Sequence, residues 1–372
     1  MKLAGLRVID LSVFLPGPYL TLALADHGAE VVKIESPTGD PGRRIGLSDG
    51  PHTVFFRNLN RGKKSVVLNL KTDTDRESLL RLCDSADVFV ESFRPGVVER
   101  LGVGYETIAA RNPGIVYCSV NAFGRDSPYR ERPAHDLAIE ALAGVLSMTL
   151  GDDRRPAVPG LPMADLLAAL QGLSGVLMAL YRREHTGRGD HLEIAMHDAA
   201  VAGLPNILGP VFAERRQPDP KDERTTGGGA FYRIYDTRDG RQIVLAGQEM
   251  KFVEPVLQAL GCSDLAELCA RGPGPHQRPV IECLQTFFAT KTQAEALAWL
   301  AGFDICFAPV NTLLEALDDP NVVERGMTLE DGKGRRHLAP PIRYDEEPAR
   351  PDLHAPELGE HTEEILARLG RT

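Results

Sequence analysis

The stretch LRVIDLSVFLPGPYLTLALADHGAEVVKIE, residues 6–35, decides the fold of this chain. It contains two short apolar runs, at 6–12 and 29–35, on either side of a helical pattern at 19–28. A strand, a helix and a second strand in this order form a βαβ unit, in which the two strands run parallel. The stretch therefore predicts the beginning of a parallel sheet covered by helices.

The same alternation continues along the chain. It predicts strands at 64–70, 87–92 and 114–120, separated by helices near 74–85 and 97–110. Four to five parallel strands are therefore expected within the first 120 residues. Two long helical patterns follow, at about 136–149 and 166–184, and we expect both helices to pack on the sheet.

A change of composition marks a second domain. Residues 205–229 are rich in proline, charge and glycine, which is typical of an exposed crossing segment. The stretch FYRIYDTRDGRQIVLAG then predicts a hairpin that turns at Arg238, Asp239 and Gly240. We predict an α/β fold with these parts: a large parallel-sheet domain at 1–204, a crossing linker at 205–225, a small α+β domain at 226–327 and a C-terminal segment at 328–372.

Composition excludes several classes of function. The 372 residues include 42 Lys and Arg against 52 Asp and Glu, and the net charge of -10 disfavours nucleic acid as a partner. No apolar run approaches the roughly 20 residues that span a bilayer, and the first residues lack the regions of a signal peptide, so we expect a cytoplasmic protein without a membrane partner. Neither the cysteines nor the histidines show the spacing of a metal site.

The first βαβ unit imitates a dinucleotide site but lacks its glycines. Glu35 ends the second strand and Gly17 lies in the first turn, as in such sites. However, the turn FLPGP has one glycine between two prolines, where the dinucleotide fingerprint needs three glycines. The sequence therefore argues against a nicotinamide or flavin enzyme.

Three ionisable residues lie where a strand or loop meets a helix, so their side chains can project into a cleft. His135 precedes a helix that Asp136 could cap, and histidine suits proton transfer near neutral pH. Asp165 precedes a long amphipathic helix and could act as a base or as a nucleophile toward an acyl group. Glu249 follows a strand at the edge of the next helix. Each also has a structural interpretation: an ordered loop for His135, an N-cap for Asp165 and a favourable helix-dipole contact for Glu249.

Basic residues concentrate between positions 43 and 94 of this acidic chain. Many such clusters are solvated surface, but residues at the ends of parallel strands are where open α/β sheets bind ligands. A phosphorylated small molecule is therefore a plausible ligand. The basic residues concerned are Arg43, Arg44, Arg57, Arg61, Lys63, Lys64, Lys71 and Arg94.

The chain resembles the class III CoA-transferase family, which also contains α-methylacyl-CoA racemase. Eight blocks in the expected order carry the resemblance: LAGLRVIDLS, GPYLTLALADHGAEVVKIESP, NLNRGKKSVVLNLK, ESFRPGVVERLGVGY, TGRGDHLEIAMHDA, GGGAFYRIYDTRDGR, CFAPVNTLLEALDDPNVVERG and PELGEHTEEIL. The resemblance implies an interlocked homodimer, in which each chain has a large Rossmann-like domain and a small domain, and the C-terminal segment returns to the large one. The active site would lie between the large domain of one subunit and the small domain of the other.

The resemblance also implies the ligand. Coenzyme A (CoA) enters as part of an acyl-CoA substrate, and no metal or redox cofactor is implied. The residues expected near CoA are Arg43, Arg61, Lys63, Lys71, Arg94, Gly96, Val97 and Gly104.

The resemblance leaves two reactions open, and the residues favour the racemase. The pair His135-Asp136, the stretch AGQEMKF with Glu249 and the turn FLPGP look like the racemase form, while Ser36 departs from it. A racemase would use His135, supported by Glu249, on one face of the α-carbon of a 2-methylacyl-CoA and Asp165 on the other, with backbone N–H groups of the helix after Asp165 holding the enolate oxygen. The alternative is a CoA-transferase in which Asp165 attacks the acyl carbon. A CoA-binding protein without turnover is a third possibility.

Overall fold

The computed structural model describes residues 1–151 and 153–370, which fall into two compact units. Each unit is built from stretches of chain that are separated in the sequence. The first unit comprises Met1–Ala143, Pro159–Gly203 and Pro320–Thr372, and the second comprises Gly144–Val158 and Leu204–Asp319.

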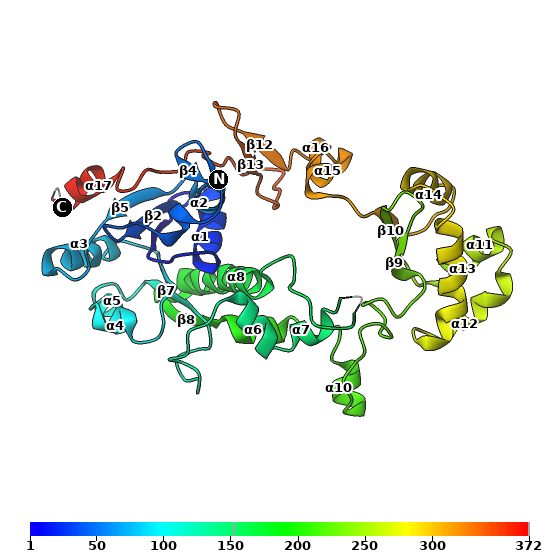
Figure 1. The fold of residues 1–372 in the computed structure, drawn as a ribbon. Helices are drawn as coiled ribbons and strands as arrows, with labels where there is room; N and C mark the ends of the chain where they lie inside the picture. Colours follow the sequence, from blue (N-terminus) through cyan, green and yellow to red (C-terminus); the bar gives the residue numbers. More distant parts are fainter. Residues whose placement is uncertain (152, 371–372) are drawn as a thin grey trace. The chain divides into compact units, whose positions relative to one another are not determined.

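A six-stranded sheet forms the framework of the first unit, and every neighbouring pair of its strands is parallel (Figure 1). If its strands are numbered along the chain, their order across the sheet is 3-2-1-4-5-6, the order of doubly wound Rossmann folds. The predicted parallel sheet is confirmed, and its last strand, β8, is one that the sequence pattern does not predict. From edge to edge the strands are β5 (Lys64–Val67), β2 (Glu30–Glu35), β1 (Arg7–Asp10), β6 (Val88–Glu91), β7 (Val116–Asn121) and β8 (Asp190–Ala195).

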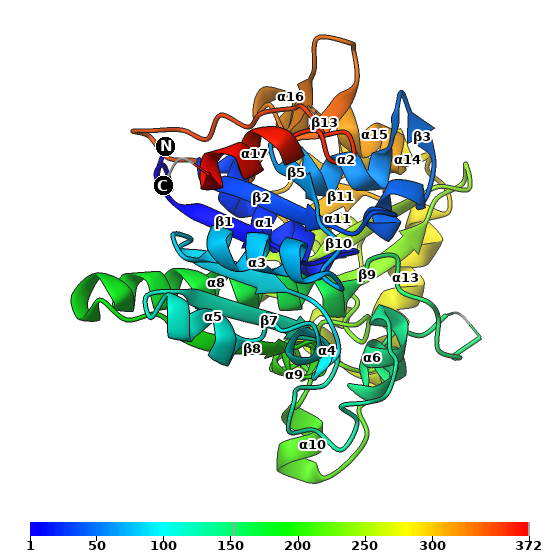
Figure 2. The same ribbon diagram turned by 90° about the vertical axis from the view of Figure 1, so that its left-hand side faces the viewer.

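The pattern at 166–184 packs on this sheet as predicted, whereas the pattern at 136–149 contacts the long helix at 163–186 in its first half and belongs to the second unit from residue 144. The helices α3 (Asp73–Cys83), α5 (Tyr105–Arg111) and α17 (Thr362–Leu369) share one apolar core with strand residues such as Ile9 and Phe89. The helices α1 (Pro16–Asp26) and α8 (Met163–Thr186) contact each other, and α8 also contacts β7 and β8 (Figure 2). The sheet is thus buried between layers, and its strands β1, β6 and β7 are almost completely buried.

Glycines break two of the predicted helices. The pattern at 136–149 forms two helices, α6 (Asp136–Leu142) and α7 (Val145–Met148), because Gly144 between them adopts φ 87°. The pattern at 97–110 likewise forms α4 (Val97–Arg100) and α5. Helical periodicity identifies buried positions, but it does not show where a left-handed residue ends the helix.

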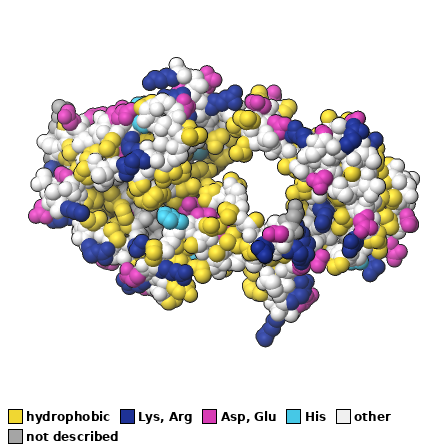
Figure 3. All heavy atoms as spheres, viewed as in Figure 1, with side chains coloured by type: hydrophobic (Ala, Val, Ile, Leu, Met, Phe, Trp, Pro, Cys, Tyr) yellow, Lys and Arg dark blue, Asp and Glu magenta, His cyan; other side chains and the backbone are white. Residues whose placement is uncertain are grey.

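The helix α8 is longer than predicted. It spans 24 residues and is long and apolar enough, by length and composition only, to cross a membrane, so the expectation that no apolar run approaches this length is wrong. One side of α8 packs on the first unit, whereas Leu170, Leu177, Met178 and Tyr181 are exposed. Figure 3 shows hydrophobic side chains gathered over the part of this unit where α1 and α8 lie.

The second unit contains a three-stranded antiparallel sheet that packs against helices. The predicted hairpin is present: β9 (Tyr232–Asp236) pairs with β10 (Gln242–Ala246), and Gly240 in the turn has φ 74°. The third strand, β11 (Phe307–Pro309), pairs with the other edge of β10. The helices that share its core are α11 (Met250–Ala259), α12 (Ala266–Ala270), α13 (Arg278–Phe288) and α14 (Gln293–Leu300).

Short elements complete the two units. They are β3 (Ser48–Asp49), β4 (His52–Thr53), α2 (Val54–Asn60), α9 (Met196–Ala202), α10 (Gly209–Glu214), α15 (Leu313–Leu317), α16 (Pro320–Glu324), β12 (Thr328–Glu330) and β13 (Arg336–Leu338).

The end of the chain covers one edge of the large sheet. The strand β5 is an edge strand, since it pairs only with β2 within the sheet. The N–H of His361 donates to the carbonyl of Ser65 at 2.9 Å, and the N–H of Val67 donates to Oγ1 of Thr362 at 3.0 Å. The residues around α17 therefore occupy hydrogen-bonding groups that β5 would otherwise expose.

Candidate active site

The carboxyl edge of the parallel sheet opens into a cavity of about 550 Å³. Its walls come from the residues that follow β1, β6 and β7 and from the first turn of α8. The neighbours β1 and β6 are the strands between which the strand order reverses, and ligands of doubly wound sheets bind at this point. The wall residues with charged or titratable side chains include Arg94, Arg100, Arg130, Arg132, His135 and Asp165.

Asp165 is the third residue of α8 and lines this cavity. It is therefore not an N-cap, which was its structural interpretation. The side chain is half-buried, and within the described part of the chain it has no hydrogen bond or ion pair. Burial, together with the neighbouring carboxylates of Asp136 and Glu140, raises the pKa of Asp165 to about 7. A carboxylate with this environment is more basic and more nucleophilic than an exposed one.

Carboxylates of α6 cap the first turn of α8. Oδ1 of Asp136 accepts the N–H of Asp165 at 3.0 Å, and Oε1 of Glu140 accepts the N–H of Met163 at 2.8 Å. Asp136 thus caps a different helix from the one expected. The N–H groups of Met163 and Asp165 are therefore occupied, and the N–H of Leu166, the first after Asp165, donates to the carbonyl of Pro162 at 3.1 Å.

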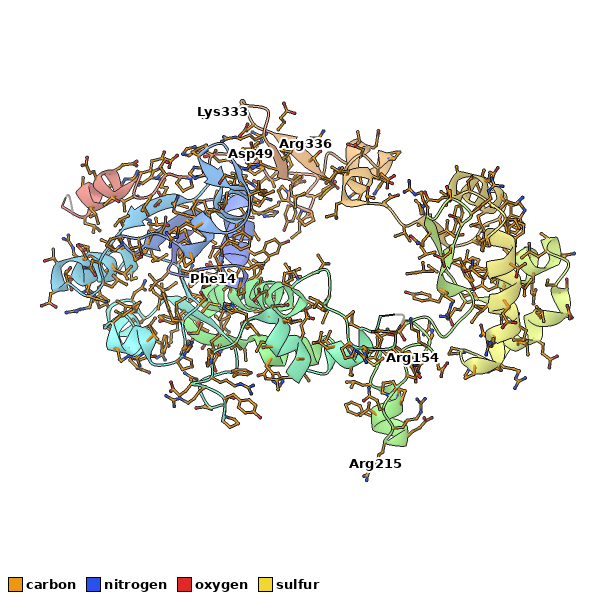
Figure 4. The ribbon with its side chains drawn as sticks, viewed as in Figure 1. Phe14, Asp49, Arg154, Arg215, Lys333 and Arg336 are labelled. Carbon is orange, nitrogen blue, oxygen red and sulfur yellow. The ribbon has the colours of Figure 1, made fainter. Side chains whose placement is uncertain are left out.

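His135 lines the same cavity and forms the N-cap position of α6. Its ring packs edge-on against Phe14, with ring centroids 5.7 Å apart. Phe14 lies in the loop after β1 (Figure 4) and has φ 64°, a strained value for a residue with a bulky side chain. Sequence reasoning does not single out Phe14. The feature of the sequence that could have identified Phe14 is the tight turn FLPGP that contains it. The turn is so close-packed that a Cβ on Gly17 would lie 2.2 Å from Cβ of Ser12.

Glu249 belongs to the other compact unit. It is the N-cap residue of α11, its side chain is exposed, and it lines a separate cavity of about 480 Å³ together with Arg224 and Gln248. His135 and Asp165 therefore line one cavity of the first unit, and Glu249 lines a cavity of the second unit.

Three of the cations expected near CoA point into the protein. Nζ of Lys63 is buried and bonds to Asp10, Thr21, the carbonyl of Pro18 and Asn60. Arg61 forms a buried ion pair with Asp26. Arg43 pairs with Glu35 and lies over the ring of Phe56. These cations hold the sheet and its loops together, and within the described residues they have protein partners.

The other expected residues lie at the carboxyl edge. Arg94 and Val97 line the 550 Å³ cavity, and Lys71 lines a second cavity of about 370 Å³ at the ends of β1, β2 and β5. Gly96 and Gly104 are the N-cap residues of α4 and α5. The side chains of Arg94 and Lys71 are exposed, so both can meet an anionic ligand there.

A scan against family models matches residues 3–362 to CoA-transferase family III. The chain belongs to this family. Known members catalyse more than one reaction. The chain is 33% identical to the succinyl-CoA:mesaconate CoA-transferase of Haloarcula marismortui, over 99% of this chain and 96% of that protein. It is also 33% identical to the human alpha-methylacyl-CoA racemase, over 100% of this chain and 94% of that protein.

A solved structure agrees with the family assignment. The crystal structure of a CaiB/BaiF family protein from Brucella suis matches with a TM-score of 0.86 at 29% identity, and the match covers 99% of both chains. The α/β fold with its large parallel sheet is therefore that of the family.

Proposed function

We propose that this family III protein is a CoA-transferase, which moves CoA between an acyl-CoA and a carboxylic acid with Asp165 as its nucleophile. One observation carries the proposal: Asp165 offers a carboxylate that has no hydrogen bond or ion pair within the described residues and is half-buried in the wall of the large cavity. Relatives that bear CoA-transferase names support it, among them the Haloarcula protein and an acetyl-CoA:oxalate CoA-transferase of Acetobacter aceti, 34% identical over 96% of this chain and 92% of that protein.

The proposed reaction needs only acyl transfers. The Asp165 carboxylate attacks the thioester carbon, the C–S bond breaks, and a mixed anhydride and CoA thiolate form. The thiolate then attacks the Asp165 carbonyl, which releases the first acid and leaves an aspartyl-CoA thioester. An acceptor carboxylate attacks the carbonyl of that thioester, the C–S bond breaks, and a new anhydride and CoA thiolate form. The thiolate finally attacks the new acyl carbon, which gives the new acyl-CoA and restores the carboxylate of Asp165.

A second candidate, racemisation of a 2-methylacyl-CoA, is favoured by the position of His135 in the same cavity as Asp165. Two proton-transfer groups in one cavity could serve opposite faces of an α-carbon. The similarity to the human racemase also supports this candidate. The family resemblance implies that Glu249 from the small domain of a second subunit supports His135 in this reaction.

One experiment separates the two reactions. The protein is incubated with a 2-methylacyl-CoA in deuterated water, and in a parallel sample with a carboxylate acceptor. A transferase is expected to form the new acyl-CoA only when the acceptor is present and to leave the α-carbon protonated, as mass spectrometry can measure. Deuterium at the α-carbon without an acceptor would overturn the transferase and support the racemase. If the protein catalyses neither deuterium exchange nor CoA transfer, it is a CoA-binding protein without turnover.

The variant His135→Ala sharpens this experiment. In a transferase it should reduce activity far less than loss of Asp165 does, because no proton needs to move in the acyl-transfer steps. In a racemase it should abolish deuterium exchange, since one face of the α-carbon loses its base. A His135→Ala protein with no CoA transfer would contradict a role for Asp165 alone.

Replacement of Arg94 by Ala is expected to weaken binding of both free CoA and acyl-CoA by about 10- to 100-fold, because a charge-assisted phosphate contact is lost. Calorimetric titration measures both affinities. Arg278→Ala, an exposed arginine on α13 of the second unit, serves as the control and should bind normally. An unchanged affinity of the Arg94 variant would place that side chain among ordinary surface charges.

We further propose that the protein acts as a homodimer, as the family resemblance implies, with Glu249 of a second copy completing the site. Light scattering across a dilution series checks this, and an active monomer would contradict it.

A further inference from the structure

We propose that Glu140 is a positioning residue for Asp165: one oxygen of its buried carboxyl holds the first turn of α8, and the other places a second acidic group beside the nucleophile. This inference rests on the proposed function, since it assigns Glu140 a role through Asp165. Sequence reasoning does not identify Glu140, which occupies the middle of an apolar helical pattern.

Glu140 is unusual for a glutamate because its side chain is completely buried in the first unit. Oε1 accepts the N–H of Met163 at 2.8 Å. Oε2 is also buried, and within the described residues it has no hydrogen-bond partner. Burial of a carboxyl oxygen without a hydrogen-bond partner lowers the stability of the fold. The carboxylate of Glu140 therefore destabilises the folded protein more than a neutral group of the same shape would.

The cap by itself does not require a charge. Glutamine has the same shape as glutamate, and its single carbonyl oxygen could accept the N–H of Met163 equally well. Asp136, one helical turn before Glu140 on α6, already caps the N–H of Asp165. What glutamate adds at this position is therefore a second oxygen and a negative charge next to the nucleophile.

A negative charge on Glu140 disfavours a second negative charge on Asp165. Two acidic groups of α6, Asp136 and Glu140, act on the charge of Asp165, and burial acts in the same sense. Together they disfavour the ionised form of Asp165. The charged or titratable side chains that line the same cavity as Asp165 include His135, Arg94, Arg100, Arg130 and Arg132. Burial and Asp136 also raise the pKa of Glu140, while the N–H of Met163 opposes them. Three carboxyl groups therefore lie close together where α6 meets the first turn of α8, and of these Asp165 lines the cavity.

The test is the pH profile of kcat/KM for CoA transfer by the full chain. Wild-type activity should fall as the pH drops through about 7, because protonated Asp165 is not a nucleophile. In Glu140→Gln, the cap is kept and one negative charge is removed. We therefore expect the acid limb of the profile, which is the fall of activity toward low pH, to move to lower pH by about 0.5 to 1 unit. At high pH, activity should stay within about threefold of wild type, since a glutamine carbonyl preserves the cap.

Two further variants separate charge from structure. Glu184→Gln removes an exposed carboxylate near the other end of α8 and should leave the acid limb in place. Glu140→Ala removes both cap and charge, and should lower the melting temperature of the protein, whereas Glu140→Gln should not.

The outcomes distinguish this inference from the proposed function. An acid limb that does not move in Glu140→Gln overturns the role of the charge, even if activity falls, because a purely structural role would lower activity without shifting the limb. Retention of transfer activity in an Asp165 variant would instead overturn the proposed function, whatever Glu140→Gln does.

Discussion

Asp165→Asn is expected to reduce CoA transfer by at least about a thousandfold, the scale of loss when a covalent nucleophile is removed. Asparagine has nearly the same shape as aspartate, but its amide cannot form the anhydride or the aspartyl-CoA thioester. The backbone N–H of residue 165 can still donate to Asp136, so the first turn of α8 should remain in place. Initial rates of acyl-CoA formation with an acceptor acid measure the effect.

A covalent readout accompanies the rates. Wild-type protein mixed with acyl-CoA should show CoA bound to the α8 peptide by mass spectrometry, and Asp165→Asn should not. Asp198→Asn, which changes an exposed aspartate on α9, serves as the control and should keep both activity and adduct. Turnover by the Asp165 variant within tenfold of wild type would exclude the anhydride mechanism.

Asp10→Asn is expected to lower the free energy of unfolding by about 3–5 kcal/mol, the usual result of removing one partner from a buried ion pair. Asp10 is completely buried at the end of β1, where Oδ2 accepts from Nζ of Lys63 at 3.0 Å and from Thr21 at 2.7 Å. The nearby Lys33, also buried, pairs with Asp40 at 2.8 Å. The neutral amide would leave Lys63 as a buried cation without a countercharge on Asp10.

Urea unfolding followed by circular dichroism measures the loss. Asp73→Asn, which removes an exposed ion pair with Arg76 on α3, should leave the unfolding midpoint unchanged. A similar midpoint for wild type and Asp10→Asn would show that hydrogen bonds from Ser12 and Thr21, rather than the ion pair, hold this region.

The same residue predicts a pH dependence of stability. Burial alone would raise the pKa of Asp10, but Lys63 and Lys33 hold that pKa well below its usual range. Because the pKa is depressed in the folded protein, the stabilisation is present above the unfolded value of roughly 3.9 and is lost as the pH falls below it. The stability difference between wild type and Asp10→Asn should therefore shrink in acid.

The sequence predicts the core of the fold well because buried positions are occupied mainly by apolar residues. The strands β1, β2 and β7 lie inside short runs that are rich in apolar residues, since both faces of a parallel sheet are covered. The strand β8 is missed because its residues begin with Asp190 and His191 and are only partly buried. The breaks near Gly144 and Gly102 are missed because a single left-handed residue leaves the apolar pattern intact.

The candidate site is predicted in part. Chemistry and position at a helix junction identify His135 and Asp165, and the structure brings them into one cavity because both junctions lie at the carboxyl edge of the sheet. Residue type alone does not reveal whether a cation points outward, as Arg94 does, or inward, as Lys63 does. Nor does it reveal Phe14 and Glu140, whose significance depends on neighbours that are distant in the sequence.

The position of α17 has a consequence for biosynthesis. The residues that cover the outer edge of β5 follow the whole second unit in the sequence, so they are translated after it. A nascent chain therefore carries an uncovered strand edge for most of translation, and an uncovered edge can pair with other chains. Completion of the first unit must wait until His361 and Thr362 have been translated, so a product that terminates before them would be prone to aggregation rather than a shortened enzyme.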